Sequence, residues 1–129
     1  MEQMPIVLVV EDDELLQGVV KDALSEGGFD FMTCASGEEA VTVLHSGVTT
    51  YRALVTDINL KGRMSGWEVA RNARQADPDL AVVYMTGAAA DDWPAEGVPG
   101  SILLQKPFAP AQLVTAVSQL LNKGSPSSS

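Results

Sequence analysis

The sequence predicts an α/β fold: a doubly wound, five-stranded parallel sheet with helices on both faces. Two observations lead to this prediction. Apolar, β-branched runs recur five times along the 129 residues, and amphipathic helical patterns lie between them. Strands that alternate with helices form βαβ units, whose right-handed crossovers place helices on both faces of a parallel sheet.

The first three predicted elements are a strand, a helix and a second strand. Residues 6–10 are a continuous apolar run, which is typical of a strand buried on both faces. Residues 14–26 space their apolar side chains as a helix does, and a Gly-Gly pair follows where that helix should end. Residues 29–34 alternate in polarity, which predicts a strand at the edge of the sheet.

The middle of the chain repeats this alternation. Residues 36–39 (SGEE) have the spacing of a capping box, which predicts the start of a helix. The Asp77-Pro78 pair is expected to end the next helix, because the residue before a proline disfavours the helical conformation. The predicted elements of this part are a helix from 36 to about 45, a strand over 53–56, a helix over 65–76 and a strand over 80–85.

The last third of the chain contains the weakest helical signal. Pro94 and Gly97 interrupt residues 87–100, so the fourth helix is expected to be short or irregular. The elements expected after it are a strand over 101–104 and a helix over 110–121. The Ser-rich residues 124–129 are expected to form a disordered tail, which leaves 1–123 as one domain.

The strand order follows from how apolar each run is. The first, third and fourth runs are the most apolar and should be central, with the second and fifth at the edges. That arrangement agrees with the flavodoxin-like order 2-1-3-4-5, in which the ligand crevice opens where strands one and three part.

Composition excludes several classes of function. The formal net charge of −9 argues against unaided nucleic-acid binding and against anionic membrane surfaces. No stretch approaches the roughly 20 apolar residues that a membrane-spanning helix needs. The single cysteine, Cys34, rules out an internal disulfide framework and suits a reducing compartment, so a cytoplasmic location is expected.

Polar side chains follow four of the predicted strands. They are Glu11 and Asp12 after the first, Asp57 after the third, Thr86 after the fourth and Lys106 after the fifth. Because the carboxyl ends of parallel strands lie along one rim, and strands one and three meet at the crevice, the three carboxylates should converge there.

Three carboxylates in one crevice repel one another, so such a cluster persists if it binds a cation or keeps a proton. Each pair at about 4 Å costs roughly 4 kcal/mol at an effective dielectric constant near 20. Carboxylate oxygens suit Mg²⁺ better than Zn²⁺, and the sequence has no Cys/His cluster. A carboxylate, a divalent cation, an ammonium and a hydroxyl are what phosphoryl transfer requires, which makes Asp57 the candidate nucleophile and phosphoacceptor.

At these residues the chain resembles the receiver domains of two-component response regulators. The matching motifs keep the family's order and spacing along nearly the whole chain, and five together are a specific signal. They are VVED at 9–12, VTD at 55–57, MSG at 64–66, MTG at 85–87 and QKPF at 105–108.

The resemblance implies a set of roles for the site. It implies that Asp12, Asp57 and the backbone carbonyl of Asn59 bind Mg²⁺, and that Glu11 acts partly through water. It also implies that Lys106 and Thr86 bind the phosphoryl oxygens, and that the Lys106–Pro107 peptide bond is cis.

The resemblance also implies a place in signalling. The phosphoryl donor is expected to be a phosphohistidine on a histidine kinase or phosphotransfer protein. The chain would then catalyse only its own phosphorylation and dephosphorylation. Its output would pass by protein–protein contact to an unlinked downstream protein, from a monomer or weak dimer.

The chain departs from the family at three places. The loop after Asp57 is one residue longer than usual and has Lys61 where proline is common. Leu103 stands where the family often has Tyr or Phe, and the fourth helix is cut short. These departures concern how the signal leaves the domain rather than the phosphorylation chemistry.

Other interpretations of the same residues stay open. Asp12 or Asp13 could simply cap the first helix. The chain could be a receiver-like interaction module without the chemistry, although the complete set of Asp57, Thr86 and Lys106 argues against this. It could also be an aspartyl-phosphate phosphatase, but Asn59 stands where that class needs a second Asp.

Overall fold

The computed structural model describes residues 4–88 and 90–123, and the predicted disordered tail lies outside this part. Its strands are β1 (Ile6–Val10), β2 (Asp30–Cys34), β3 (Ala53–Asp57), β4 (Ala81–Thr86) and β5 (Ile102–Gln105). Its helices are α1 (Glu14–Glu26), α2 (Gly37–Ser46), α3 (Gly66–Ala76), the 3₁₀ turn η1 (Ala90–Asp92), α4 (Trp93–Glu96) and α5 (Pro110–Lys123). The predicted elements are therefore present in the predicted order.

All strand pairs are parallel, and their order is β2-β1-β3-β4-β5. This confirms the predicted doubly wound fold. Every residue of β3 and β4 is buried, whereas in β2 exposed and partly buried residues alternate up to the buried Cys34, as is typical of an edge strand. The strands that the sequence identified as most apolar are the central ones.

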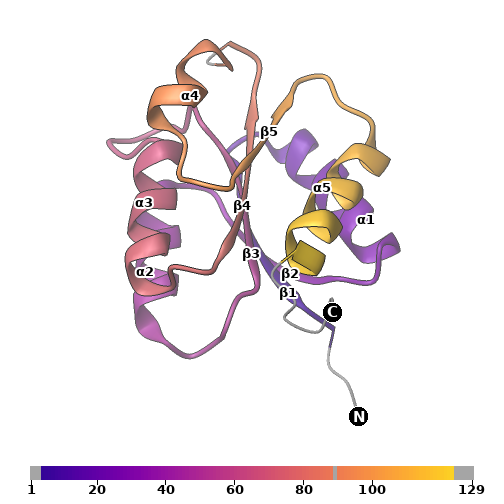
Figure 1. Ribbon diagram of the computed structural model, residues 1–129, viewed down its shortest axis with the longest axis horizontal. Coiled ribbons are helices and arrows are strands. Elements are labelled where there is room, and N and C mark those ends of the chain that lie inside the picture. The colour runs from indigo at the N-terminus through magenta and orange to yellow at the C-terminus, as the bar shows by residue number, and fades with distance from the viewer. Residues whose placement is uncertain (1–3, 89, 124–129) are drawn as a thin grey trace.

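Helices cover both faces of the sheet (Figure 1). One face carries α1 and α5, and the other carries α2, α3 and the short α4. Successive strand side chains point to opposite faces, so Val7 and Val9 pack under α1 and α5 while Leu8 and Val10 pack under α2 and α3. Two apolar cores result, one on each side of the sheet.

Side-chain caps define where the helices begin. Asp13 caps α1, because its Oδ1 accepts from the backbone N of Leu15 at 2.9 Å. Ser36 caps α2, and Ser65 and Glu68 form a reciprocal capping box at α3. The cap of α1 is therefore Asp13, and the Asp12 side chain is directed elsewhere.

The segment between β4 and β5 is short and irregular, as predicted. Pro94 stands at the start of α4, and Gly97 ends this four-residue helix. Hydrogen bonds hold the segment in place: the Val98 amide donates to the buried Tyr84 hydroxyl at 3.1 Å, and Trp93 Nε1 donates to Ser101 Oγ at 3.0 Å.

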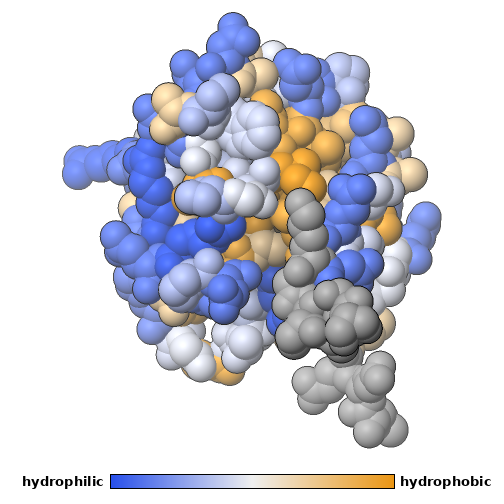
Figure 2. All heavy atoms as spheres, viewed as in Figure 1, coloured by the Kyte–Doolittle hydropathy of each residue, from blue (hydrophilic) through white to orange (hydrophobic). Residues whose placement is uncertain are grey.

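The edge at β5 is incompletely covered. Figure 2 shows apolar side chains gathered between the two helical layers near this edge. Ile102, Leu104, Ala111 and Ala116 line a shallow groove between β5 and α5. Among the described residues, no helix has the length and apolar character that a bilayer crossing requires.

Candidate functional site

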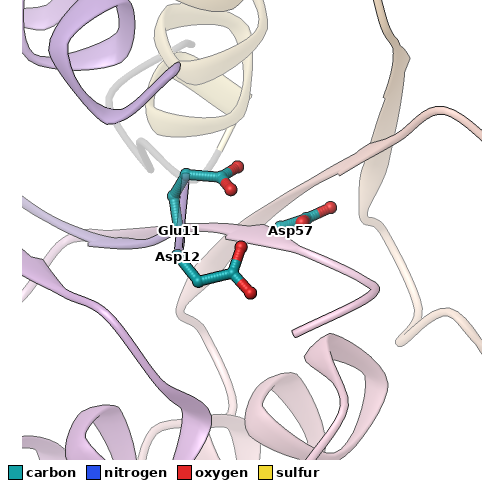
Figure 3. A group of neighbouring side chains, drawn as sticks. All are labelled: Glu11, Asp12 and Asp57. Atoms are coloured by element: carbon teal, nitrogen blue, oxygen red, sulfur yellow. The ribbon is translucent and has the colours of Figure 1, made fainter. Parts of the chain in front are cut away.

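The carboxyl ends of β1 and β3 bring three carboxylates together. The two strands are neighbours, with Val10 paired to Thr56, so Glu11 and Asp12 follow β1 beside Asp57 at the end of β3. One oxygen from each of the three carboxylates lies within 4.8 Å of the others. Figure 3 shows the three side chains extending toward the same side of the sheet edge. We call Glu11, Asp12 and Asp57 the carboxylate cluster.

Burial sets the electrostatics of this cluster. Glu11 is 1% exposed and Asp57 is 5% exposed, while Asp12 is partly buried. Loss of hydration raises the pKa of Glu11 to about 7, and the nearby Asp57 charge acts in the same direction. Burial also raises the pKa of Asp57, and the Lys106 ammonium opposes this rise.

Lys106 is the cation that faces the cluster. Its Nζ lies 3.2 Å from Asp57 Oδ1 and 3.5 Å from Glu11 Oε1. The strand pairing of β4 and β5 brings it there, and its backbone N donates to Thr86 O at 2.8 Å. The Lys106–Pro107 peptide bond is cis, as the resemblance implied.

Thr86 ends β4 on the same rim. Its neighbour Met85 is paired with Asp57, and Thr86 itself is fully buried. The Thr86 hydroxyl accepts a hydrogen bond from the backbone N of Ala88 at 3.1 Å. The structure thus places a hydroxyl one strand away from the Asp57 carboxylate.

Asn59 lies in the loop between β3 and α3, two residues beyond Asp57. It is exposed and lines the same surface hollow as Asp12. The role of its backbone carbonyl as a metal ligand stays a prediction.

The carboxylate cluster has the donor set that a hard divalent cation needs. Glu11 Oε1 is buried and has no hydrogen-bond partner among the described residues. A buried anionic oxygen without a hydrogen-bond donor is costly, and one lysine does not compensate three carboxylates. Because all the available ligand atoms are oxygens, Mg²⁺ fits this site by charge and by chemistry.

Sequence analysis missed one contributor to this site. Glu38 was assigned only to the start of a helix, but its Oε2 accepts from the backbone N of Arg63 at 3.0 Å, in the loop after Asp57. In the same loop, the backbone N of Lys61 donates to Asp12 Oδ2 at 2.9 Å. No sequence signal predicts these contacts, because they depend on the path of the loop backbone.

Comparison with known proteins follows the same motifs. The sequence model of the response regulator receiver domain family matches residues 7–118. The response regulator receiver protein CpdR of Brucella abortus is 31% identical over 124 residues, which cover 92% of this chain and 98% of CpdR.

Longer proteins contain similar segments. The sensor kinase CckA of Brucella abortus is 31% identical over 120 residues, but the match covers only 12% of CckA. The response regulator MprA of Mycolicibacterium vanbaalenii is 31% identical over 129 residues, which are 53% of its length. The chain therefore spans only part of these two relatives.

A solved structure shows the same architecture. The response regulator receiver protein from Sinorhizobium medicae superposes with a TM-score of 0.92 at 41% identity, covering 95% of this chain and 98% of that protein. Together these comparisons confirm the resemblance that the five motifs predicted.

Proposed function

The chain belongs to the receiver-domain family of two-component response regulators, and we propose that it is a switch phosphorylated on Asp57 in a Mg²⁺-dependent reaction. The observation that supports this most directly is the carboxylate cluster with Lys106 Nζ 3.2 Å from Asp57 Oδ1. Receiver domains are signalling switches rather than conventional enzymes, and we propose that this chain catalyses only its own phosphorylation and dephosphorylation.

In the proposed reaction, Asp57 is the nucleophile. One of its carboxylate oxygens forms a bond to phosphorus while the P–N bond to the donor's phosphohistidine breaks. The electron pair of that bond stays on the imidazole nitrogen, and the product on this chain is an acyl phosphate. The ammonium of Lys106 offsets charge on a phosphoryl oxygen, and the Thr86 hydroxyl donates a hydrogen bond to another.

The groups proposed to hold Mg²⁺ are Glu11, Asp12, Asp57 and the backbone carbonyl of Asn59. Glu11 is proposed to act partly through water. When bound, the ion supplies positive charge that offsets the charge of the equatorial phosphoryl oxygens. Glu11 Oε1 supports this assignment, because it is buried and no described residue donates a hydrogen bond to it.

Partners and location are proposed on the same basis. The phosphoryl donor is a histidine kinase or phosphotransfer protein, and the output is contact with an unlinked downstream protein, by a monomer or weak dimer. We propose no nucleic-acid or membrane partner, because the net charge is −9. A reducing, cytoplasmic location suits the buried, unpaired Cys34.

Intact-protein mass spectrometry tests the proposed phosphoacceptor. With acetyl phosphate and Mg²⁺, the wild-type chain should gain the mass of one phosphoryl group, and Asp57→Asn should gain none, because an amide is not nucleophilic enough to attack phosphorus. Asp30→Asn removes the same charge from an exposed position on β2 and should label as the wild type does.

Either of two results would overturn the proposal. The wild-type protein could fail to gain phosphate with Mg²⁺ present, as an interaction module without the chemistry would. Alternatively, the Asp57→Asn variant could label as fully as the wild type, which would place the acceptor elsewhere.

A further inference from the structure

The loop that joins β3 to α3, residues 58–65, is held by carboxylates from three separate segments: the β1–α1 loop, α2 and α3. Its backbone amides at positions 61, 63 and 65 each donate to a carboxylate oxygen. The pairs are Lys61 N to Asp12 Oδ2 at 2.9 Å, Arg63 N to Glu38 Oε2 at 3.0 Å and Ser65 N to Glu68 Oε1 at 3.2 Å. Only the third of these is a local helix cap, so the other two fix the path of the loop.

The contact at Lys61 involves a member of the carboxylate cluster. Asp12 lies two residues beyond β1; one of its carboxylate oxygens is near those of Glu11 and Asp57, and its Oδ2 accepts from Lys61 N. A hydrogen bond from a rigid donor orients a metal-binding carboxylate and lowers the cost of ordering it. The position of Lys61 N therefore influences how Asp12 faces Asp57.

The contact at Arg63 is made by Glu38, in the first turn of α2. The loop backbone approaches this carboxylate closely at Gly62, which has a φ of +101°, and a Cβ there would lie 3.1 Å from Glu38 Oε1. The Arg63 amide is also the main reason that the pKa of Glu38 is lowered. The Glu38 carboxylate therefore lies directly against the loop backbone, and the Arg63 amide favours its charged form.

Asp12 and Glu38 thus hold amides that are only two residues apart in the chain. The side chains of Leu60 and Met64 pack against the apolar core on either side, so the stretch between them, residues 61–63, is the part that the two carboxylates hold. The described residues give Arg63 N no other acceptor, so Glu38 is what restrains this part of the loop.

We propose that Glu38 is a positioning residue for the phosphoryl site, which acts by holding the loop against Asp12 and so orienting Asp12 toward the cation. This inference rests on the proposed function, because it assigns Glu38 a role in Mg²⁺ binding at that site. Glu38 is not a member of the carboxylate cluster.

Hydrogen exchange of the metal-free protein tests the first half of the proposal. In Glu38→Ala, the amides of Lys61 and Arg63 should exchange about tenfold faster than in the wild type. Arg63 N loses its acceptor, and Lys61 N loses the restraint that holds the loop near Asp12. Glu39→Ala is the matched control: it removes the neighbouring acid and also one backbone contact, from Ala35 N at 2.9 Å, but touches no loop amide.

Calorimetric titration with Mg²⁺ tests the second half. Glu38→Ala should weaken Mg²⁺ binding by about tenfold, the lower end of what loss of a ligand-orienting contact costs, because Glu38 is exposed to solvent. Glu38→Gln keeps an oxygen that accepts from Arg63 N and should recover most of the affinity. Glu39→Ala should bind as the wild type does.

The outcomes separate this inference from the proposed function. Unchanged loop exchange in Glu38→Ala overturns the inference, and so does a Mg²⁺ affinity that falls equally in Glu38→Ala and Glu39→Ala. Absence of Mg²⁺ binding by the wild type contradicts the proposed function, and the orienting role falls with it. Faster loop exchange together with weaker Mg²⁺ binding in Glu38→Ala alone supports both.

Discussion

Glu11 is a buried carboxylate whose charge the described residues compensate only in part. Its side chain is enclosed by the ends of β1 and β3; Oε2 accepts from Asp13 N at 3.0 Å, and Oε1 has no hydrogen-bond donor among the described residues. Lys106 lies 3.5 Å from Oε1 but is shared with Asp57. Without a bound cation, Glu11 therefore favours its protonated form, and its pKa is raised from 4.5 to about 7.

This raised pKa predicts a pH-dependent effect of Glu11→Gln on stability. The unfolded chain loses the Glu11 proton near pH 4.5, whereas the folded chain keeps it up to about pH 7. The protonated carboxyl therefore contributes its full stability below pH 4.5, and that contribution disappears as the pH rises through about 7. Its size is on the order of 3 kcal/mol.

Gln stays neutral at every pH, so Glu11→Gln should be more stable than the wild type at pH 8 in magnesium-free buffer, by about 1–3 kcal/mol. At pH 5 the difference should shrink to below about 1 kcal/mol. Urea unfolding at both pH values measures the difference. Glu14→Gln, at an exposed acid in α1, should show no such pH-dependent gain, and an equal difference at pH 5 and pH 8 for Glu11→Gln would contradict the prediction.

At the scale of elements, the start of α3 is packed directly against the strand that ends in Asp57. Gly66 N donates to Ile58 O at 2.9 Å, and a Cβ at Gly66 would lie 2.1 Å from the Asp57 carbonyl oxygen and 2.8 Å from Ile58 Cα. These are backbone atoms of a buried strand end, which have no room to move. The glycine of the MSG motif is therefore required by this close approach of α3 to β3.

Gly66→Ala should accordingly destabilise the protein by more than about 3 kcal/mol, or prevent it from folding. Gly18→Ala is the control, and its effect on stability should have the opposite sign. Gly18 lies inside α1 with open space around it, so alanine should stabilise the helix by about 0.5–1 kcal/mol. Thermal unfolding of both variants measures these changes in stability. A Gly66→Ala protein as stable as the wild type would contradict the steric requirement for glycine at position 66.

The segment from η1 to β5 has an interrupted helical pattern, but contacts with neighbouring elements hold it in one conformation. Its contacts come from neighbouring elements: Arg71 of α3 pairs with Glu96, and the Tyr84 hydroxyl of β4 accepts from Val98 N. Leu103, where the family often has an aromatic residue, is partly buried against the same core as Tyr84. An aliphatic side chain thus occupies position 103 beside this face.

At the scale of the whole molecule, cation binding and folding should be coupled. The chain carries a net charge of −9, and the carboxylate cluster is assembled only when β1 and β3 are paired. Mg²⁺ that binds the folded state alone stabilises it by about 2.7 kcal/mol at a concentration of 100 Kd. At one fixed Mg²⁺ concentration the gain should be larger at pH 8 than at pH 6, because Glu11 must lose its proton to add its negative charge to the site.

Unfolding in MgCl₂ and in NaCl of matched ionic strength measures this coupling. Asp12→Asn should lose most of the magnesium-specific gain, because it removes a charged ligand of the cluster. Asp22→Asn, an equal charge change on the exposed face of α1, should keep the gain. A gain that is the same in both salts, or in both variants, would mean that Mg²⁺ acts only as a general counterion.

The sequence alone was sufficient to predict the five strands, their order and the meeting of Glu11, Asp12 and Asp57. These features follow from hydrophobic periodicity and from the handedness of parallel crossovers, which depend on local pattern and topology. The predicted boundaries were less exact: Asp57 and Thr86 were expected just after their strands, whereas they are the last residues of β3 and β4.

Only the tertiary structure decided how deeply Glu11 is buried, why position 66 admits no side chain and which acid holds the loop after Asp57. Burial is the sum of packing from several elements, and a backbone amide carries no side-chain identity that a sequence pattern reveals. Glu38 and Glu39 are adjacent acids in the same helical turn, yet one reaches Arg63 and the other Ala35. That difference arises from the direction in which each side chain leaves the helix.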